Sequence, residues 1–580
     1  MKTALKSLKI WMTLAVAVSC VRLVGAAPLT LTWNGGAAGN LSDETWSGGE
    51  AGHLSPQNGD TLVFSTGGTF TSDIAGLQVA ALNFSSSSAV TISGSEKITV
   101  LCGGQVRSTG SGTVKILSPI QAGETAGAAV TFADVGSKDN PLNINGNISG
   151  AAPIGVGAAN GTVEFRGTNT FTGKLSVTNG FFNAVGKDSL GLGTEEAYFV
   201  TGTGNGRAKI TLTGVTVRMP VRESPGNQSG EITFAYLAAS PTTTFMENVV
   251  VNSDGSPQWM VNNWANVVFN KKLSVSKDWQ GQISTGGKME IKGEGSTVRG
   301  YIMSLVGSNA TYAYNGLLIV HVPLTLATVT DWGSYGMGFY KDFGVLRLMV
   351  ADAFPNARAD YGWNPLRFNK NNQGVTAKGN VLDLNGYSQT FACIRDDAKE
   401  TSNIIKSDSK ACVLRLKQSW STVKPGTTQP GNDFYGEIRG KVSVSIEGSD
   451  PCFFGGPNTS TGYFSLTNGA TAGFTSTGVW KGTNYVVSAG STLVVSNTAA
   501  LLANSVITMA DAPEQATKSC LLLGDGSYSA RSMTIDGQLL YKGTWGSSQS
   551  DAKYVDDVHF KGPGTLTLSK GLSGMAIIFR

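Results

Sequence analysis

The chain has 580 residues, of which 44 are basic and 40 acidic, and its formal net charge is +4. Only 14% of the residues are charged, against about 25% in an ordinary soluble protein. A nearly neutral, sparsely charged chain lacks the basic surface with which proteins attract nucleic acid, so we exclude nucleic acid as a partner. No segment has the roughly 20 consecutive apolar residues of a transmembrane helix, so we do not expect an integral membrane protein.

The first residues have the pattern of a secretion signal. Three lysines precede an apolar run over residues 10–18, and Val24-Gly25-Ala26 then offers the residues that a signal peptidase recognises. We expect residues 1–27 to be a signal peptide, with cleavage after Ala26 or Ala27. The mature protein is then expected to be secreted or held at the cell surface.

Short alternating strands follow along the whole chain. Apolar residues alternate with polar or small ones at Val90 and Ile92, Ile98 and Val100, Val163 and Phe165, Leu175 and Val177, Leu382 and Leu384, Val442, Val444 and Ile446, and Leu566 and Leu568. A period of two predicts strands with one buried face. The 75 glycines recur between these strands in Asn-Gly, Thr-Gly and Gly-Thr pairs, which are typical of turns. Helical patterns are almost absent, and only residues 498–502 suggest one helical turn.

Many short strands with tight turns can form either a solenoid or several β-sandwich domains. No linker divides the chain, and the segment Asn169–Gly180 is echoed by Thr459–Gly469, as expected for stacked coils. We therefore predict an all-β, single-stranded parallel β-helix, with several β-sandwich domains as the alternative. The predicted parts are an N-terminal cap with the first coils (28–101), the solenoid (102–520) and the C-terminal coils with a cap (521–580).

Four segments resemble the autotransporter-associated β-strand repeat proteins, which are secreted bacterial β-helix proteins. The resemblance rests on Trp33-Asn34-Gly35-Gly36 with Asn40 and Gly59–Phe64; on Asn169–Gly180 with Asp188–Gly191; on Leu346–Leu348, Phe354–Asn356 and Leu382–Thr390; and on Ser532–Gly537, Gly543–Trp545 and Gly562–Leu568. The chain has Thr45-Trp46 where family members usually have Asn-Trp. The resemblance implies a right-handed β-helix and display at, or release from, the cell surface.

Metal and nucleophile motifs are not found in the sequence. His53, His321 and His559 are widely separated, and no Cys-x-x-Cys pair, His-x-x-x-His spacing or acidic calcium loop occurs. We therefore expect no metal and no cofactor. The mature chain would keep five cysteines, which we interpret as small buried residues, with a bridge between Cys393 and Cys412 as the alternative.

One segment, from residue 331 to residue 363, combines aromatic and charged side chains as sugar-binding clefts do. We predict ligand binding by its exposed aromatic residues Trp332, Tyr335, Tyr340, Tyr361 and Trp363, which Trp259, Trp264 and Trp279 could extend. The expected partner is polysaccharide or another component of the cell surface. The other interpretation is that the aromatic residues cap coils and fill the interior.

The same segment also permits an enzymatic hypothesis. A glycoside hydrolase needs two carboxylates about 5 to 9 Å apart, and the candidates are Asp331, Asp342 and Asp360. A lyase needs a basic residue to take a proton, for which Lys341, Arg347 and Arg358 are candidates. We favour a non-catalytic structural or adhesin-like β-helix at the cell surface and keep a polysaccharide-degrading enzyme as the alternative.

Overall fold

The computed structural model describes residues 27–50, 53–200, 209–224, 231–251, 258–275, 280–284, 286–299, 304–305, 316–327, 338–339, 343–354, 366–368, 379–396, 399–418, 433–512 and 518–573. These residues are nearly all in strands and turns, with one short 3-10 helix, η3 (Thr498–Ala500), capped by the side chain of Asn497. The chain divides into two compact units, Met1–Gly173 and Lys174–Arg580. The all-β prediction and the predicted helical turn are both confirmed.

Unit 1 is built from fourteen strands. They are β1 (Thr30–Trp33), β2 (Ala38–Asn40), β3 (Trp46–Ser47), β4 (Thr61–Phe64), β5 (Gly68–Thr71), β6 (Gln78–Phe84), β7 (Val90–Ser93), β8 (Ile98–Ser108), β9 (Val114–Ile116), β10 (Ile120–Ala122), β11 (Val130–Asp134), β12 (Leu142–Ile144), β13 (Ile148–Ser149) and β14 (Ile154–Phe165).

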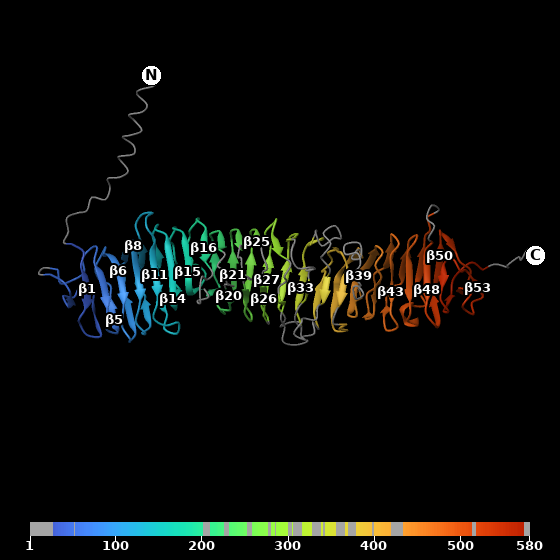
Figure 1. The fold of residues 1–580 in the computed structure, drawn as a ribbon, viewed down its shortest axis with the longest axis horizontal. Helices are drawn as coiled ribbons and strands as arrows, with labels where there is room; N and C mark the ends of the chain where they lie inside the picture. Colours follow the sequence, from blue (N-terminus) through green and yellow to red (C-terminus); the bar gives the residue numbers. More distant parts are fainter. Residues whose placement is uncertain are drawn as a thin grey trace, which may run out of the picture. The chain divides into compact units, whose positions relative to one another are not determined.

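Parallel pairing runs through unit 1 from coil to coil (Figure 1). One ladder is β1–β4–β6–β8–β11–β14 and a second is β2–β5–β7–β9–β12–β14. Each strand thus pairs with the equivalent strand of the next coil, as in a solenoid. Sandwich domains are built from antiparallel sheets, so the sandwich alternative is wrong for this unit.

Aromatic side chains close the start of unit 1. Trp33 and Trp46 are 2% and 4% exposed, and their rings meet edge to face with centroids 5.2 Å apart. Trp33 also packs against Phe70, and Trp46 against Phe64. β3 pairs antiparallel with β1, so it covers the edge that the first parallel strand would otherwise expose.

Unit 2 begins with two ladders. Their strands are β15 (Leu175–Val185), β16 (Ala197–Val200), β17 (Lys209–Thr213), β19 (Val221–Ser224), β20 (Glu231–Ala235), β22 (Val249–Val251), β23 (Gln258–Val261), β25 (Leu273–Val275), β26 (Gln280–Ile283), β28 (Thr297–Arg299), β29 (Ser304–Leu305) and β31 (Thr325–Ala327). They pair in parallel as β15–β17–β20–β23–β26–β29 and as β15–β16–β19–β22–β25–β28–β31.

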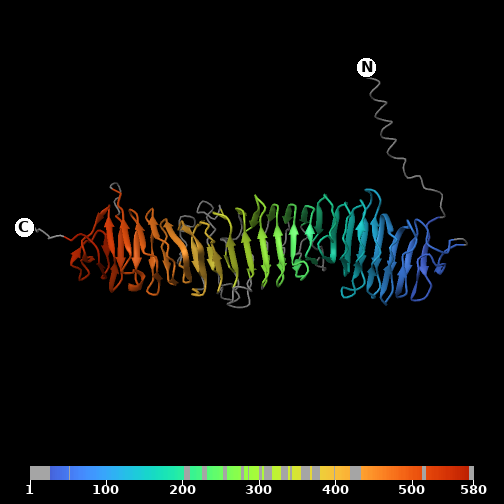
Figure 2. The same ribbon diagram turned by 180° about the vertical axis from the view of Figure 1, so that it is seen from behind.

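A third ladder of unit 2, which we call the long wall, continues toward the C-terminus. It contains β18 (Thr216–Val217), β21 (Thr242–Phe245), β24 (Asn266–Phe269), β27 (Lys288–Ile291), β30 (Leu317–Val320), β33 (Val345–Leu348), β35 (Val381–Asp383), β38 (Ile404–Leu416), β39 (Glu437–Glu447), β42 (Phe464–Thr467), β45 (Asn484–Val487), β47 (Val506–Met509) and β50 (Ser532–Ile535), with β36 (Gln389–Phe391) beside β38. All these pairings are parallel, and the strands lie side by side in Figure 2; the register shifts once, between Ser407 and Cys412 of β38 where it pairs with β39.

The remaining strands of unit 2 form smaller sheets. They are β32 (Gly338–Phe339), β34 (Leu366–Phe368) and β37 (Ile394–Asp396); β40 (Cys452–Phe454), β43 (Thr471–Phe474), β46 (Thr492–Val495), β48 (Cys520–Leu523) and β54 (Phe560–Lys561); β41 (Pro457–Asn458) and β44 (Val479–Trp480); and β49 (Ser527–Ala530), β52 (Gly543–Gly546), β53 (Tyr554–Val555) and β55 (Thr565–Leu568), while β51 (Gln538–Leu539) follows β50.

Every alternating apolar position on which the strand prediction rests faces the interior. In β39, Val442, Val444 and Ile446 are fully buried, and Leu566 and Leu568 of β55 are at most 1% exposed. Residues of adjacent coils then stack directly, as Phe245 does on Phe269 with ring centroids 4.9 Å apart. The core of each unit is therefore a set of apolar columns perpendicular to the strands.

The echoed segments occupy equivalent turns. A Cβ on Gly173 would lie 2.1 Å from the carbonyl oxygen of Ala152, and one on Gly462 would lie 2.3 Å from that of Val442. The glycine is needed because the backbone of the preceding coil passes too close for any side chain. Just before each glycine, the buried side chains of Asn169 and Asn458 accept hydrogen bonds from backbone amides of that coil, at 2.7 and 2.9 Å.

Antiparallel pairs appear again at the C-terminal end of unit 2. β51 folds back on β50 through a turn in which Asp536 and Gly537 have φ angles of 49° and 75°, the combination that a type I′ hairpin requires. β52 likewise pairs antiparallel with β55. These pairs interrupt the repeated parallel pairing, so this end of unit 2 is capped.

Candidate functional site

The predicted aromatic site falls almost wholly outside the described residues. Two sets of candidates lie outside them. The predicted ligand-binding residues are Trp332, Tyr335, Tyr340, Tyr361 and Trp363, and the candidate catalytic residues are Asp331, Lys341, Asp342, Arg358 and Asp360. Residues 1–26, which hold most of the predicted signal peptide, also lie outside. These assignments stay predictions.

Two described aromatic residues of that region belong to the core, whereas a third, Phe343, is partly exposed. Phe339 and Phe354 are at most 1% exposed, and Phe339 stacks on Phe368 with centroids 5.1 Å apart. The proposal that Trp259 extends a sugar-binding surface is wrong. Its side chain is fully buried between Phe234 and Phe269, and its indole Nε1 donates to Glu223 at 3.2 Å.

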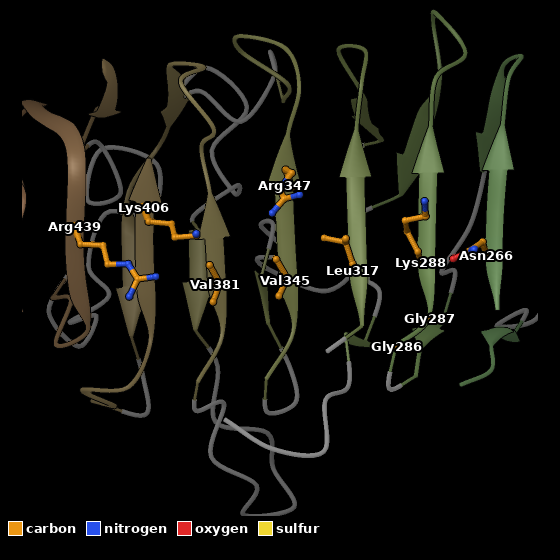
Figure 3. A pocket seen from close by; sticks show the side chains of 10 residues that line it. All are labelled: Asn266, Gly286, Gly287, Lys288, Leu317, Val345, Arg347, Val381, Lys406 and Arg439. Atoms are coloured by element: carbon orange, nitrogen blue, oxygen red, sulfur yellow. The ribbon is translucent and has the colours of Figure 1, made fainter. Parts of the chain in front are cut away.

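A shallow groove of about 340 Å³ crosses the long wall of unit 2 (Figure 3). We call it the wall groove. Its lining consists of two glycines, an asparagine, three aliphatic residues and four basic residues: Asn266, Gly286, Gly287, Lys288, Leu317, Val345, Arg347, Val381, Lys406 and Arg439. None of these ten residues is acidic, so the groove offers cations beside aliphatic surface.

The parallel register explains why residues so far apart in sequence meet here. Successive coils align Lys288, Leu317, Val345, Val381, Ile404 and Glu437 in one outward column. A second column, two residues further along each strand, aligns Glu290, Ile319, Arg347, Asp383, Lys406 and Arg439. The side chains between the two columns, such as Leu346 and Leu382, point into the core.

The aliphatic part of the groove forms a continuous floor. Val345, Val381 and Ile404 are 8%, 1% and 5% exposed and pack together with Leu317. They lie on the outer side of the wall, opposite the core columns. Over these coils the outer side of the wall therefore carries one apolar column, beside the second outward column with its charged residues.

Carboxylates hold the basic side chains of the groove in place. The ammonium group of Lys288 lies 2.8 Å from Glu290, which also contacts Lys292 at 3.1 Å and His321 at 2.9 Å. Burial alone would raise the pKa of Glu290, but hydrogen bonds from the two lysines lower it to about 2. Glu290 is therefore ionised at any physiological pH and keeps Lys288 oriented.

Two further carboxylates act in the same way. Arg347 donates through Nε to Asp383 at 2.9 Å. Asp408 contacts Lys406 at 2.5 Å and lies 3.9 Å from Nε of Arg439. Both guanidinium groups thus meet their carboxylates through Nε, and each has further N–H donors on its terminal nitrogens. The groove can therefore present several oriented donors to an anion.

Each of the three histidines contacts a carboxylate. His53 lies 2.6 Å from Asp60, with both side chains buried, and His321 contacts Glu290 as described above.

Within the described part of the chain, no group of three or more His, Cys, Asp and Glu residues has the arrangement of a metal site. Among the described cysteines, Cys102 is exposed and four are buried: Cys393, Cys412, Cys452 and Cys520.

His559 clamps the C-terminal cap to the preceding coil. Its Nδ1 lies 2.7 Å from Asp556 and its Nε2 3.0 Å from Asp511, which also accepts two hydrogen bonds from Ser519. Burial alone would lower the pKa of His559, but the two carboxylates raise it above its ordinary value of 6.5. Burial would also raise the pKa of Asp511, yet these hydrogen bonds lower it below 3.8.

We expect this clamp to make the stability of the cap depend on pH. A histidine whose pKa is raised on folding contributes its full stabilisation of the folded state at a pH below its unfolded-state pKa. It loses that contribution as the pH rises through its folded-state pKa. Asp511 has a lowered pKa, so its contribution to stability is present above pH 3.8 and is lost as the pH falls through its folded-state pKa. The cap should therefore be most stable between pH 3.8 and pH 6.5, the ordinary pKa values of aspartate and histidine.

Hydrogen exchange of the β54 amides as a function of pH measures this effect. Protection, corrected for the intrinsic pH dependence of exchange, should decrease above pH 6.5 in the natural chain, and His559→Gln should remove that decrease. His321→Gln is the matched control and should leave β54 unchanged. An unaltered profile in His559→Gln would contradict the clamp.

Comparison with known proteins gives no match. No protein-family model, curated protein or solved structure matches this chain. Within the described residues, no helix has the length and apolar character that crossing a membrane requires. The wall groove and the residues that line it are therefore the features from which we infer a function.

Proposed function

We propose that this chain is an exported, non-catalytic β-solenoid that serves as a structural or adhesive element at the cell surface and binds polysaccharide. The wall groove is the observation that carries the proposal. It crosses the strands of consecutive coils and joins aliphatic floor residues to four oriented basic side chains. An elongated, shallow groove suits a chain-like ligand better than a compact one, which would need a deeper pocket.

The rest of the proposal is supported by the sequence. Residues 1–27 have the pattern of a secretion signal, and the resemblance to autotransporter-associated β-strand repeat proteins implies surface display. A solenoid with close-packed apolar columns is suited to this role, because its stability is the sum of many contacts between neighbouring coils. Binding would then place a polysaccharide on a wall that need not change shape.

Two experiments test this proposal. The purified mature chain is passed over immobilised neutral and acidic polysaccharides, and we expect it to be retained by at least one without release of sugar fragments. In a second experiment, the full chain and one lacking residues 1–27 are expressed in a bacterium and located by cell fractionation. Retention of the full chain in the cytoplasm, or failure to bind any polysaccharide, would contradict the proposal.

The alternative is a polysaccharide lyase that uses the same groove. It is favoured by one observation, the position of Arg347 in the groove, since we selected this residue from the sequence as a candidate proton acceptor. A lyase would release unsaturated sugars, which absorb ultraviolet light. Turnover of an acidic polysaccharide that is lost in Arg347→Gln/Asp383→Asn, a variant that removes both partners of the ion pair, would replace our first proposal with this one.

A further inference from the structure

We infer that the wall groove binds a linear acidic polysaccharide, a chain of uronate residues, laid along the stacking direction of the coils and across the strands. This inference rests on the proposed function and specifies its ligand. Three features of the groove support it: the spacing of its basic residues, the position of their carboxylate partners, and the chemical nature of its floor.

The basic residues are spread over a length that only an extended ligand can cover. Lys288 and Arg439 are five coils apart in the register of the long wall, which corresponds to roughly 24 Å at a strand spacing of about 4.8 Å. Arg347 and Lys406 lie between them, and the intervals from Lys288 to Arg347 and from Arg347 to Lys406 are both two coils, or about 10 Å. Figure 3 shows these four side chains distributed along the groove.

Two of the four cations, Lys288 and Arg347, are more accessible than the carboxylates that orient them, whereas Lys406 and Arg439 are less exposed than their partner Asp408. The side chain of Arg347 is 40% exposed, whereas that of Asp383 is 8% exposed, and Lys288 is 35% exposed against 12% for Glu290. Asp408 is the exception at 57%. Glu290 and Asp383 thus lie behind the groove surface. A ligand approaching the groove at these coils meets ammonium and guanidinium donors first, and the ligand that satisfies them is an anion.

The floor distinguishes between kinds of polyanion. The floor offers aliphatic surface through Leu317, which is partly exposed, while Val345 and Val381 pack beside it at 8% and 1% exposed. This surface suits the C–H faces of sugar rings. Polyphosphate has no such faces. Single-stranded nucleic acid is usually held by stacking on aromatic side chains, and none of the ten lining residues is aromatic. A carboxylated sugar chain therefore matches both the cations and the floor.

Polygalacturonate and its methyl ester test the inference, because they share one backbone and differ in charge. We expect the mature chain to bind polygalacturonate at least tenfold more tightly than the ester, and its affinity to decrease as salt is added. The triple variant Lys288→Gln/Lys406→Gln/Arg439→Gln removes three cations that have exposed or multiply paired carboxylate partners. It should weaken binding at least tenfold, since each charge-assisted hydrogen bond is worth about that factor.

A control variant separates the groove from general surface charge. Lys481→Gln/Lys542→Gln/Lys570→Gln removes the same charge at exposed positions outside the groove and should bind as the natural chain does. Thermal melts followed by circular dichroism show whether each variant is folded. Arg347→Gln/Asp383→Asn, which removes a partly buried pair together, is a second groove variant if the triple variant does not fold.

The possible outcomes are distinguishable. Equal binding of polygalacturonate and its ester would overturn the acidic ligand but leave the proposed function standing. Equal binding of polyphosphate or of a single-stranded DNA would overturn recognition of the sugar. Failure to bind any polysaccharide would overturn both the inference and the proposed function.

Discussion

Trp33→Ala is expected to destabilise the N-terminal coils by about 3–5 kcal/mol, the cost of removing a large buried aromatic side chain. The Trp33 ring is 2% exposed and packs against Trp46 and Phe70. Two glycines lie against it, because a Cβ on Gly35 or Gly39 would lie 2.5 or 2.4 Å from the ring. The surrounding backbone is shaped to the indole, so a cavity would remain in the variant.

The loss should appear as faster hydrogen exchange in β1, β4 and β5, because a solenoid opens from its ends and each coil stabilises the next. Leu54→Ala is a suitable control. It truncates an apolar side chain that is 42% exposed in the same unit, and it should change the free energy of unfolding by no more than about 0.5 kcal/mol. If exchange in β1 were as slow in Trp33→Ala as in the control, Trp33 would not close the first coil.

The strands could be predicted from the sequence because each inward position requires an apolar side chain in every coil. Val90, Ile92, Val163 and Phe165 all point inward, and all are at most 1% exposed. The turn at Asp536-Gly537 was equally predictable, since both residues adopt positive φ angles that few other pairs tolerate. These features depend only on local backbone geometry and on whether a position faces the core.

The wall groove could not be predicted, because it depends on the length of each coil. Consecutive core positions of the long wall are 36 residues apart from Leu346 to Leu382 but only 23 from Leu382 to Ile405. No fixed period therefore relates Arg347 to Lys406 in the sequence. A usable signal did exist: in β33, β38 and β39 a basic residue is the third residue of the strand and directly follows an inward aliphatic one.

The error at Trp259 has a similar origin. Its place beside other aromatic residues suggested a sugar-binding surface, although composition does not reveal which face of a strand a side chain occupies. Strand alternation does, since Trp259 and Val261 are two residues apart in β23 and both are fully buried. The face assignment along each strand therefore decides which residues of this protein are available to a ligand.

That assignment can be tested at two adjacent positions of β30. Leu318 points inward and is 3% exposed, whereas Ile319 points outward and is partly exposed. Leu318→Lys would place an unpaired ammonium group in the apolar column formed with Met289 and Leu346. We expect it to cost about 4 kcal/mol or more, seen as loss of protection across the long wall.

Ile319→Lys introduces the same side chain one residue further along. In the register of the wall, Ile319 lies between Glu290 and Arg347, so the new ammonium group faces solvent with a carboxylate beside it. Its effect on the free energy of unfolding should stay within about 1 kcal/mol, and it should add a cation next to the wall groove. Ile319→Lys is therefore expected to preserve the fold and to strengthen binding of polygalacturonate. Similar destabilisation by the two variants would mean that the outer face of β30 is as closed as its inner face, and that no ligand reaches the groove at this coil.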